Sequence, residues 1–229
     1  KENIYVLNSP ILSNSQFNKF INFFGKNSIN IDCTFTQEES LANAIKRIQK
    51  EAEISVRQGI TQIILSDKDL SSQKLPMPML LCVGAINTFL IEKKLRGYVS
   101  INVQSGEALD THSFATLIGV GATTINPYLA FDSLYQRYSK KLFGQFSFDE
   151  CVQRYIKSVN AGLLKIMSKM GISVLSSYRG GCNFETVGLS RTVVDDYFPG
   201  VTSKISGIGL TGIEKKIREI HKEAFESTE

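Results

Sequence analysis

Several polar side chains follow directly after short apolar runs, and these residues have the greatest capacity for chemistry. In parallel α/β folds the carboxyl ends of the strands meet at one edge, and ligands bind there. Turns favour the same residue types, so the pattern also fits ordinary strand-to-helix turns. The groups that follow the apolar runs are Ser66-Asp67, Ser105-Gly106-Glu107, Asn126 and the segment Ser176, Ser177, Tyr178, Arg179, Gly180 and Gly181.

A Ser-Tyr-Arg-Gly-Gly segment has the composition of an anion site. Arg179 supplies a positive charge, and Gly180 and Gly181 would leave backbone N–H groups exposed before a predicted helical turn. Such N–H groups and a helix dipole attract phosphate, and barrels often bind cofactor phosphates in this way. The same residues fit a tight turn in which Arg179 pairs with Glu107 or Glu185, and we favour this simpler interpretation.

His112 follows Glu107 and Asp110 closely, and a Glu–His pair is capable of proton transfer. Ser113 or Ser105 would then be the candidate nucleophile, yet the chain has no GxSxG nucleophile elbow. We therefore expect His112 to begin a helix and to bond locally. We assign no catalytic residue, and with two histidines and no carboxylate cluster we assign no metal ligand.

Charge and cysteine content argue against several classes of protein. The 26 basic and 22 acidic residues leave a net charge of +4, and the basic residues are scattered, so we expect no nucleic-acid partner. The four cysteines stand alone without a CxxC pair, which gives no support to zinc-ribbon or iron–sulfur spacings, and we expect Cys33 and Cys82 to be buried. The most apolar stretch, 79–91, has 13 residues and is too short to span a bilayer, so we expect no membrane partner.

Strand and helix patterns alternate along the chain, and the resulting elements must position these groups. Strands that are apolar throughout are typical of parallel sheets, because both faces of such sheets are buried. The predicted strands lie at 29–35, 61–67, 98–105, 122–126 and 171–177. Helices are expected between them and at 128–142 and 149–170, with helical turns at 180–188 and 191–197 and a last helix near Thr211.

The predicted fold class is α/β, a parallel-strand TIM-barrel-like arrangement that forms an incomplete or degenerate barrel. About five strands are predicted, fewer than the eight of a full barrel, and an open doubly wound sheet also fits. Residues 1–28 are expected to form an N-terminal arm that packs on the core, and residues 29–229 a single α/β domain. Thr211 and Glu214 fit a capping box at the start of the last helix.

Four segments follow one another in an order typical of a known family. They are NSPILS at 8–13, SGEALDTHSFATLIGVGATTINPYLAF at 105–131, GLLKIMSKMGISVLSSYRGGCNFETVGL at 162–189 and YFPGVTSKISGIGL at 197–210. Together they resemble the central domain of the large subunit of glutamate synthase, over nearly the whole chain. The chain also begins at Lys1 rather than at a methionine, so we expect it to have been cut from a longer protein.

The resemblance implies a domain that lies between two catalytic ones. In that family an N-terminal domain hydrolyses glutamine, and a later domain with FMN and an iron–sulfur cluster reduces the imine formed from ammonia and 2-oxoglutarate. The central domain connects them and helps to enclose the ammonia path. The expected partners are therefore the glutamine amidotransferase domain and the FMN/iron–sulfur domain of the same parent chain, and no cofactor is expected in this segment.

On this resemblance the isolated segment is inactive, although its parent is an oxidoreductase of the cytoplasm, or of an organelle stroma if the parent is eukaryotic. Ferredoxin and NAD(P)H both stay open as electron donors. Two alternatives also stay open: a stand-alone barrel that binds a flavin or small phosphorylated ligand at its strand-end loops, and a non-catalytic adaptor. The candidate interdomain or channel-side residues are Ser105, Gly106, Glu107, His112, Asn126, Ser176, Ser177, Tyr178 and Arg179.

Overall fold

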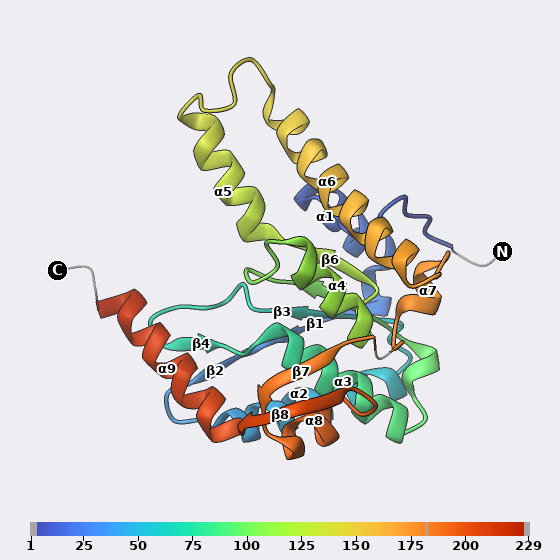
Figure 1. Ribbon diagram of the computed structural model, residues 1–229, viewed down its shortest axis with the longest axis vertical. Helices are drawn as coiled ribbons and strands as arrows, with labels where there is room; N and C mark the ends of the chain where they lie inside the picture. The colour runs from blue at the N-terminus through green and yellow to red at the C-terminus, as the bar shows by residue number, and fades with distance from the viewer. Residues whose placement is uncertain (1–3, 182, 227–229) are drawn as a thin grey trace.

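The computed structural model describes residues 4–181 and 183–226, and a parallel β-sheet lies at its centre (Figure 1). The strands are β1 (Ser28–Asp32), β2 (Thr34–Thr36), β3 (Gln62–Ser66), β4 (Lys74–Pro76), β5 (Ser100–Gln104), β6 (Thr124–Asn126), β7 (Glu185–Leu189) and β8 (Thr202–Ile208). The helices are α1 (Asn14–Phe24), α2 (Leu41–Arg57), α3 (Met79–Glu92), α4 (Thr111–Val120), α5 (Tyr128–Ser139), α6 (Phe148–Lys169), α7 (Leu175–Tyr178), α8 (Arg191–Tyr197) and α9 (Leu210–Glu226), with short 3-10 turns at Gly25–Asn27 and Arg96–Tyr98.

The main sheet has the order β1-β3-β5-β6, and all of its neighbouring strands are parallel. Neighbours in the sheet therefore follow the order of the chain, with α2, α3 and α4 as the connections. A barrel winds in this single direction, whereas a doubly wound sheet reverses its order partway. Within the described residues β6 does not pair back to β1. The predicted α/β fold, a parallel barrel-like sheet that stays incomplete, is confirmed.

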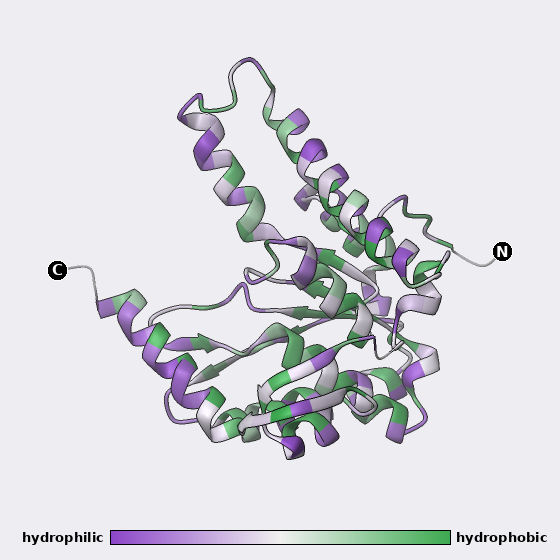
Figure 2. Cartoon of the chain, viewed as in Figure 1, coloured by the Kyte–Doolittle hydropathy of each residue, from purple (hydrophilic) through white to green (hydrophobic). Residues whose placement is uncertain are grey.

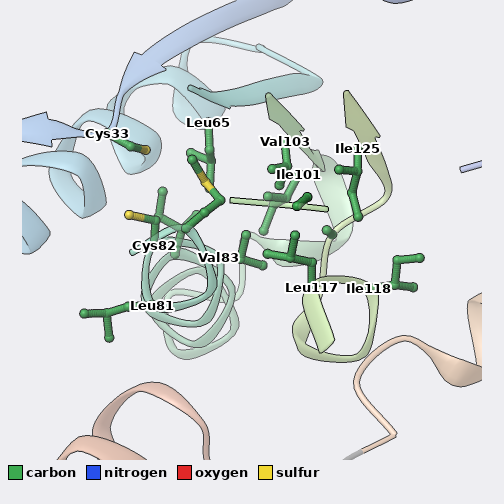
Figure 3. Packing of buried hydrophobic residues seen from close by; sticks show 14 of the residues in the cluster. Cys33, Leu65, Leu81, Cys82, Val83, Ile101, Val103, Leu117, Ile118 and Ile125 are labelled. Carbon is green, nitrogen blue, oxygen red and sulfur yellow. The ribbon is translucent and has the colours of Figure 1, made fainter. Parts of the chain in front are cut away.

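The core lies between this sheet and α2, α3 and α4. Alternate strand residues such as Leu65 and Val103 point to the helices, where they meet Val83 of α3 and Leu117 of α4 (Figure 3). Helix α3 carries apolar residues on nearly every side, and most of them are buried. The hydropathy colouring agrees, since the central strands and α3 are mainly hydrophobic and α9 carries many hydrophilic residues (Figure 2). Burial of Cys33 and Cys82 in this core is confirmed.

The N-terminal segment extends the sheet beyond β6. Ile11 forms a parallel bridge with Ile125, and the Leu12 N–H donates to the Ile125 carbonyl at 2.9 Å. Leu12, Phe17 and Phe20 then pack with Ile64, which faces away from the helices α2–α4 because strand side chains alternate between faces. Helix α1 thus covers the second face of the sheet. The proposed boundary at residue 28 stays a prediction.

The C-terminal part adds a smaller two-stranded sheet, and its helix α8 packs on α3. Strands β7 and β8 pair in parallel, and α8 connects them. Helix α9 returns to α2, where the Glu214 carboxylate accepts from the Leu41 N–H at 2.9 Å. Glu214 also pairs with Arg218, and Thr211 lies inside α9 rather than ahead of it. The predicted Thr211–Glu214 capping box is therefore wrong.

Two predicted elements between α6 and α8 are also wrong. The segment 171–177 is not a strand, because Gly171 ends α6 at a positive φ of 69° and the chain then forms the single helical turn α7. The segment 180–188 is not a helical turn, since Glu185–Leu189 forms β7 against β8. Both short segments were ambiguous locally, and their partners in space decided their conformation. Upstream, α5 and α6 project together from the body of the molecule (Figure 1).

Candidate functional site

Asp67 organises the carboxyl edge of the main sheet. It follows β3 and is 1% exposed. Its carboxylate accepts from the Ser105 hydroxyl at 2.7 Å and from the Gly106 N–H at 3.0 and 3.1 Å, and it also accepts from the Tyr128 hydroxyl. Burial raises the pKa of the Asp67 carboxyl, although these hydrogen bonds favour its ionised form. The ends of β3 and β5 and the start of α5 are therefore joined through one carboxylate.

Glu107 extends this cluster to the start of α3. Its carboxylate accepts from the Met79 N–H at 2.8 Å, and this bond caps the helix in place of Pro78, whose ring carries no hydrogen-bond acceptor. The Glu107 residue as a whole is exposed, but protein atoms surround its carboxyl. This desolvation raises the pKa of Glu107, the nearby charge of Asp67 adds to the rise, and the Met79 N–H opposes it. Glu107 thus holds a helix terminus in place.

A second row of polar groups lies on the sheet face that α1 covers. Ser66 donates to Gln104 at 2.9 Å, and the Gln104 amide donates to the Asn126 side chain at 3.1 Å. The Asn126 amide in turn donates to the Leu12 carbonyl at 3.0 Å and to the Asn14 side chain at 2.9 Å. Asn126 also meets the first cluster, because its carbonyl accepts from the Ser105 N–H at 3.1 Å. Ser105, Gly106, Glu107 and Asn126 therefore do lie together.

His112 lies near this edge but does not form the proton-transfer pair considered from the sequence. It is exposed in the first turn of α4, beside a shallow pocket of about 240 Å³ that Glu107 and Met79 also line. The Glu107 carboxylate bonds to the Met79 N–H. The Ser113 hydroxyl donates to Asp110, the N-cap of α4, at 2.8 Å. The segment therefore begins helix α4, as expected from the sequence.

The segment 176–181 lies at the opposite edge of the sheet from Asp67. The Gly180 N–H donates to the Gly119 carbonyl at 2.7 Å, and Gly119 lies at the end of α4, just before β6 begins. The amino ends of the strands meet there. Grouping Ser176, Ser177, Tyr178 and Arg179 with the strand carboxyl ends was therefore wrong, because no strand precedes them. Ser176 and Ser177 are exposed, whereas Tyr178 is 1% exposed and its ring contacts Phe184 edge-on at 6.1 Å.

The two glycines of the candidate anion site have their N–H groups engaged. Gly180 donates to Gly119, and the Gly181 N–H donates to the Tyr178 carbonyl at 3.1 Å. What remains of the site is the guanidinium of Arg179. In the part of the chain that the structure describes, Arg179 forms no ion pair with Glu107 or Glu185, and Glu185 pairs with Lys204 at 2.7 Å. The favoured interpretation was a tight turn in which Arg179 pairs with a carboxylate. The turn is present, but the predicted ion pair is wrong.

Three contributors, Asp67, Tyr128 and Arg96, are missing from the list of interdomain or channel-side candidates. Asp67 appeared in the strand-end pattern without a role, and its position directly after a fully apolar run was the available signal. Tyr128 follows Asn126-Pro127, which marks a turn onto a helix. Arg96 lies near Arg179, and no local pattern distinguishes it from other surface arginines.

Over residues 4–181 and 183–226, no group of three His, Cys, Asp or Glu side chains gathers as a metal site requires. Cys33, Cys82 and Cys151 are buried free thiols, and Cys182 lies outside the described residues. Among the helices described, none is both long and apolar enough to cross a bilayer.

Comparison with known proteins yields a consistent set of relatives. A family model described as "Glutamate synthase central domain" matches residues 1–190. The large chain of glutamate synthase [NADPH] from Azospirillum brasilense is 47% identical over 222 residues, which cover 96% of this chain and 15% of that protein. The corresponding Bacillus subtilis chain is 44% identical, with 96% and 14% covered. The ferredoxin-dependent glutamate synthase of Pyropia yezoensis is 39% identical, with 96% and 15% covered.

Among solved structures, a DHODH from Eimeria tenella in complex with ferulenol superposes with a TM-score of 0.45 at 15% identity. The superposition covers 68% of this chain and 38% of that one. The chain spans about 15% of the length of the curated relatives named above.

Proposed function

This chain belongs to the glutamate synthase central domain family, and from that premise we propose that it is the connecting domain of a glutamate synthase large subunit. In this role it holds the glutamine amidotransferase domain and the FMN/iron–sulfur domain in register and helps to enclose the ammonia path between them. The observation that carries the proposal is that 96% of this chain matches only about one-seventh of the length of each relative. The remaining length of a parent chain would supply the catalytic domains.

The carboxyl edge of the sheet supports a role as a wall. Asp67, Ser105 and Asn126 are buried and bonded to one another or to the backbone. Groups held in this way shape loops, because their lone pairs and protons are already engaged. Enclosure matters for the chemistry, since ammonia that reaches bulk water is protonated and ceases to be a nucleophile. We propose that Glu107 and His112, the exposed members of this edge, belong to the surface beside the ammonia path.

The first experiment separates a connecting domain from an autonomous enzyme. The purified 229-residue chain is assayed for glutamine hydrolysis and for bound flavin by absorbance. We expect neither, because in the family the glutaminase nucleophile and FMN belong to other domains. A yellow protein with stoichiometric flavin, or one that released glutamate from glutamine, would contradict the proposal.

The second experiment tests the enclosure itself, in the parent glutamate synthase that carries this segment. Glu107→Ala is expected to raise the free ammonia released per glutamate formed, because it opens the proposed wall and uncaps the start of α3. Glu38→Ala is the matched control, since Glu38 is an exposed carboxylate that takes no part in the hydrogen bonds of Asp67 and Glu107. A folded Glu107→Ala enzyme, verified by its melting temperature, with an unchanged ammonia-to-glutamate ratio would remove Glu107 from the path.

The alternative of a stand-alone barrel that binds a flavin or phosphorylated ligand retains one favourable observation, the guanidinium of Arg179. That group lies at the amino edge of the sheet, away from the strand-end loops to which the alternative assigned the ligand. Titration with FMN tests it directly. We expect no saturable binding, and saturable binding that Arg179→Ala abolished would favour the alternative.

A further inference from the structure

Two arginines converge near the amino edge of the sheet, where the proposed function assigns nothing. Arg96 lies in the turn between α3 and β5, and its Nη2 donates to the Gly121 carbonyl at 2.9 Å. Arg179 directly follows α7, and its neighbour Gly180 is bonded to the Gly119 carbonyl at 2.7 Å. The Arg96 side chain and the backbone next to Arg179 are thus bonded to carbonyls two residues apart at the end of α4.

Arg96 is held rigidly, and only by neutral acceptors. Its Nε donates to the Asn87 side chain at 2.6 Å and its Nη1 to the Val99 carbonyl at 2.6 Å, in addition to the bond to Gly121. None of these partners offsets its charge. Burial and, after it, the charge of Arg179 lower the pKa of Arg96 to about 10. The second cause means that the two guanidinium groups repel each other in this structure.

Arg179 has donor capacity to spare. Its Nε is buried and has no hydrogen-bond partner, and the ion pairs among the described residues include neither Arg179 nor Arg96. A buried donor without a partner destabilises the fold, and a charged donor does so more strongly. Buried charges in proteins are normally paired. Two neighbouring arginines without a carboxylate are therefore an incomplete electrostatic arrangement.

We propose that Arg96 and Arg179 form a binding site for a single oxyanion, a carboxylate or a phosphate group. Guanidinium groups suit this ligand because their planar N–H forks match the oxygens of both groups. The nearest pocket, of about 120 Å³, is lined by Asn87, which accepts from Arg96, and by Gly180, which follows Arg179, and not by the arginines themselves. Pockets for drug-sized ligands span about 300–1,000 Å³, so this space does not admit FMN.

The site is tested on the 229-residue chain by titration with inorganic phosphate and, separately, with glutarate. Arginine Nε–Hε signals are followed by 15N NMR. We expect saturable shifts of the Arg96 and Arg179 signals. Arg179→Gln should weaken binding at least about tenfold, because one charge-assisted contact is lost. Arg179→Lys, which keeps the charge, should weaken it less.

Arg191→Gln is the matched control, since Arg191 is exposed at the start of α8 and forms no ion pair among the described residues. It should leave binding unchanged. The amide spectrum of each variant verifies that it is folded. Absence of a saturable shift with either anion, or equal binding by folded Arg179→Gln, would overturn the proposal.

Repeating the titration with the longer parent chain distinguishes the sources of the oxyanion. If an acidic side chain of a neighbouring domain fills the site, the isolated chain binds phosphate or glutarate and the parent does not. If the natural ligand is a small molecule, both bind. Either result supports the site, and its failure would leave the connecting role unaffected because that role does not depend on Arg179.

Discussion

At the scale of single residues, Asp67 has the largest structural role at the carboxyl edge. One buried carboxylate satisfies donors from Ser105 and Gly106, in the loop after β5, and from Tyr128 at the start of α5. The arrangement has a cost, because burial disfavours the charged form and raises the pKa of Asp67. The ionisation of this residue is therefore linked to the stability of the fold.

Comparison of wild-type protein with Asp67→Asn over about pH 3 to 7 should reveal this linkage. Because the folded pKa of Asp67 lies above its unfolded value, the folded state retains the proton longer. The stability advantage of wild type over Asp67→Asn should be greatest below the unfolded pKa of about 3.9 and should decline as the pH rises through the folded pKa. Urea unfolding at each pH measures both proteins.

Asp110→Asn provides the matched comparison with the opposite sign. Backbone and side-chain hydrogen bonds from Ser113 lower the pKa of Asp110, and asparagine remains a good N-cap. The advantage of wild type over Asp110→Asn should be present above the unfolded pKa and be lost as the pH falls through the folded one. If the stability advantage of wild type over both variants changed with pH in the same direction, the opposite pKa shifts of Asp67 and Asp110 would be contradicted.

At the scale of elements, α1, α2, α6 and α8 begin at serine N-caps. Ser13, Ser40, Ser147 and Ser190 each accept a hydrogen bond from a backbone N–H in the first turn of the helix that follows. At Ser147 the arrangement is a full capping box, because the Glu150 carboxylate also accepts from the Ser147 N–H at 2.8 Å. This cap defines where the projecting helix α6 begins.

Ser147→Ala should lower the free energy of unfolding by about 1 kcal/mol, because the first turn of α6 loses its cap. Ser158→Ala is the same substitution at an exposed interior position of that helix. There alanine has the better helix propensity, so stability should stay equal or rise slightly. Chemical denaturation gives the free energy of unfolding of both variants. An equal loss of stability in the two would show that Ser147 has no capping role.

Helices α3 and α8 approach closely at Gly84. A Cβ atom added there would lie 2.7 Å from the Tyr197 carbonyl oxygen and would also strike the Phe198 ring. We expect Gly84→Ala to destabilise the fold by about 1–3 kcal/mol through overpacking. Gly97→Ala, where nothing lies within 4 Å of the added atom, should have a small effect by thermal unfolding. A neutral Gly84→Ala would mean that α8 is free to shift.

At the scale of the whole molecule, the N-terminal segment is part of the same folded unit as the sheet. It adds a bridge beyond β6 at Ile11 and a set of apolar side chains on the face away from α2–α4. Asn126 is bonded to this segment as well as to the strands, so the carboxyl edge depends on it.

Leu12→Ala should therefore cost about 2–5 kcal/mol, as expected for a fully buried leucine. Val6→Ala is the matched control, because Val6 is 81% exposed and should change stability by less than about 0.5 kcal/mol. Urea unfolding of the two variants measures the difference. Similar, small effects would show that the segment is only loosely attached.

The sequence by itself determined the fold class, the family and much of the core. Short apolar runs such as Ile63-Ile64-Leu65 are buried on both faces of the sheet, and runs of this kind are typical of parallel strands. Ser105, Glu107 and Asn126 lie at one edge for a related reason, because Ser105 and Glu107 follow β5 and Asn126 ends β6, its parallel neighbour.

Only the tertiary structure decided the rest. Arg179 follows the single helical turn α7, and β7 is a strand of five residues. Neither direction is encoded locally, and contacts with α4 and β8 place them. Glu214 reaches Leu41, a residue 173 positions away, instead of capping its own helix. A local sequence pattern predicts contacts between residues that are near each other in the chain. Hydrogen bonds and charges also act between residues that only the fold brings together. The juxtaposition of Arg96 and Arg179 therefore exists only once the chain is folded.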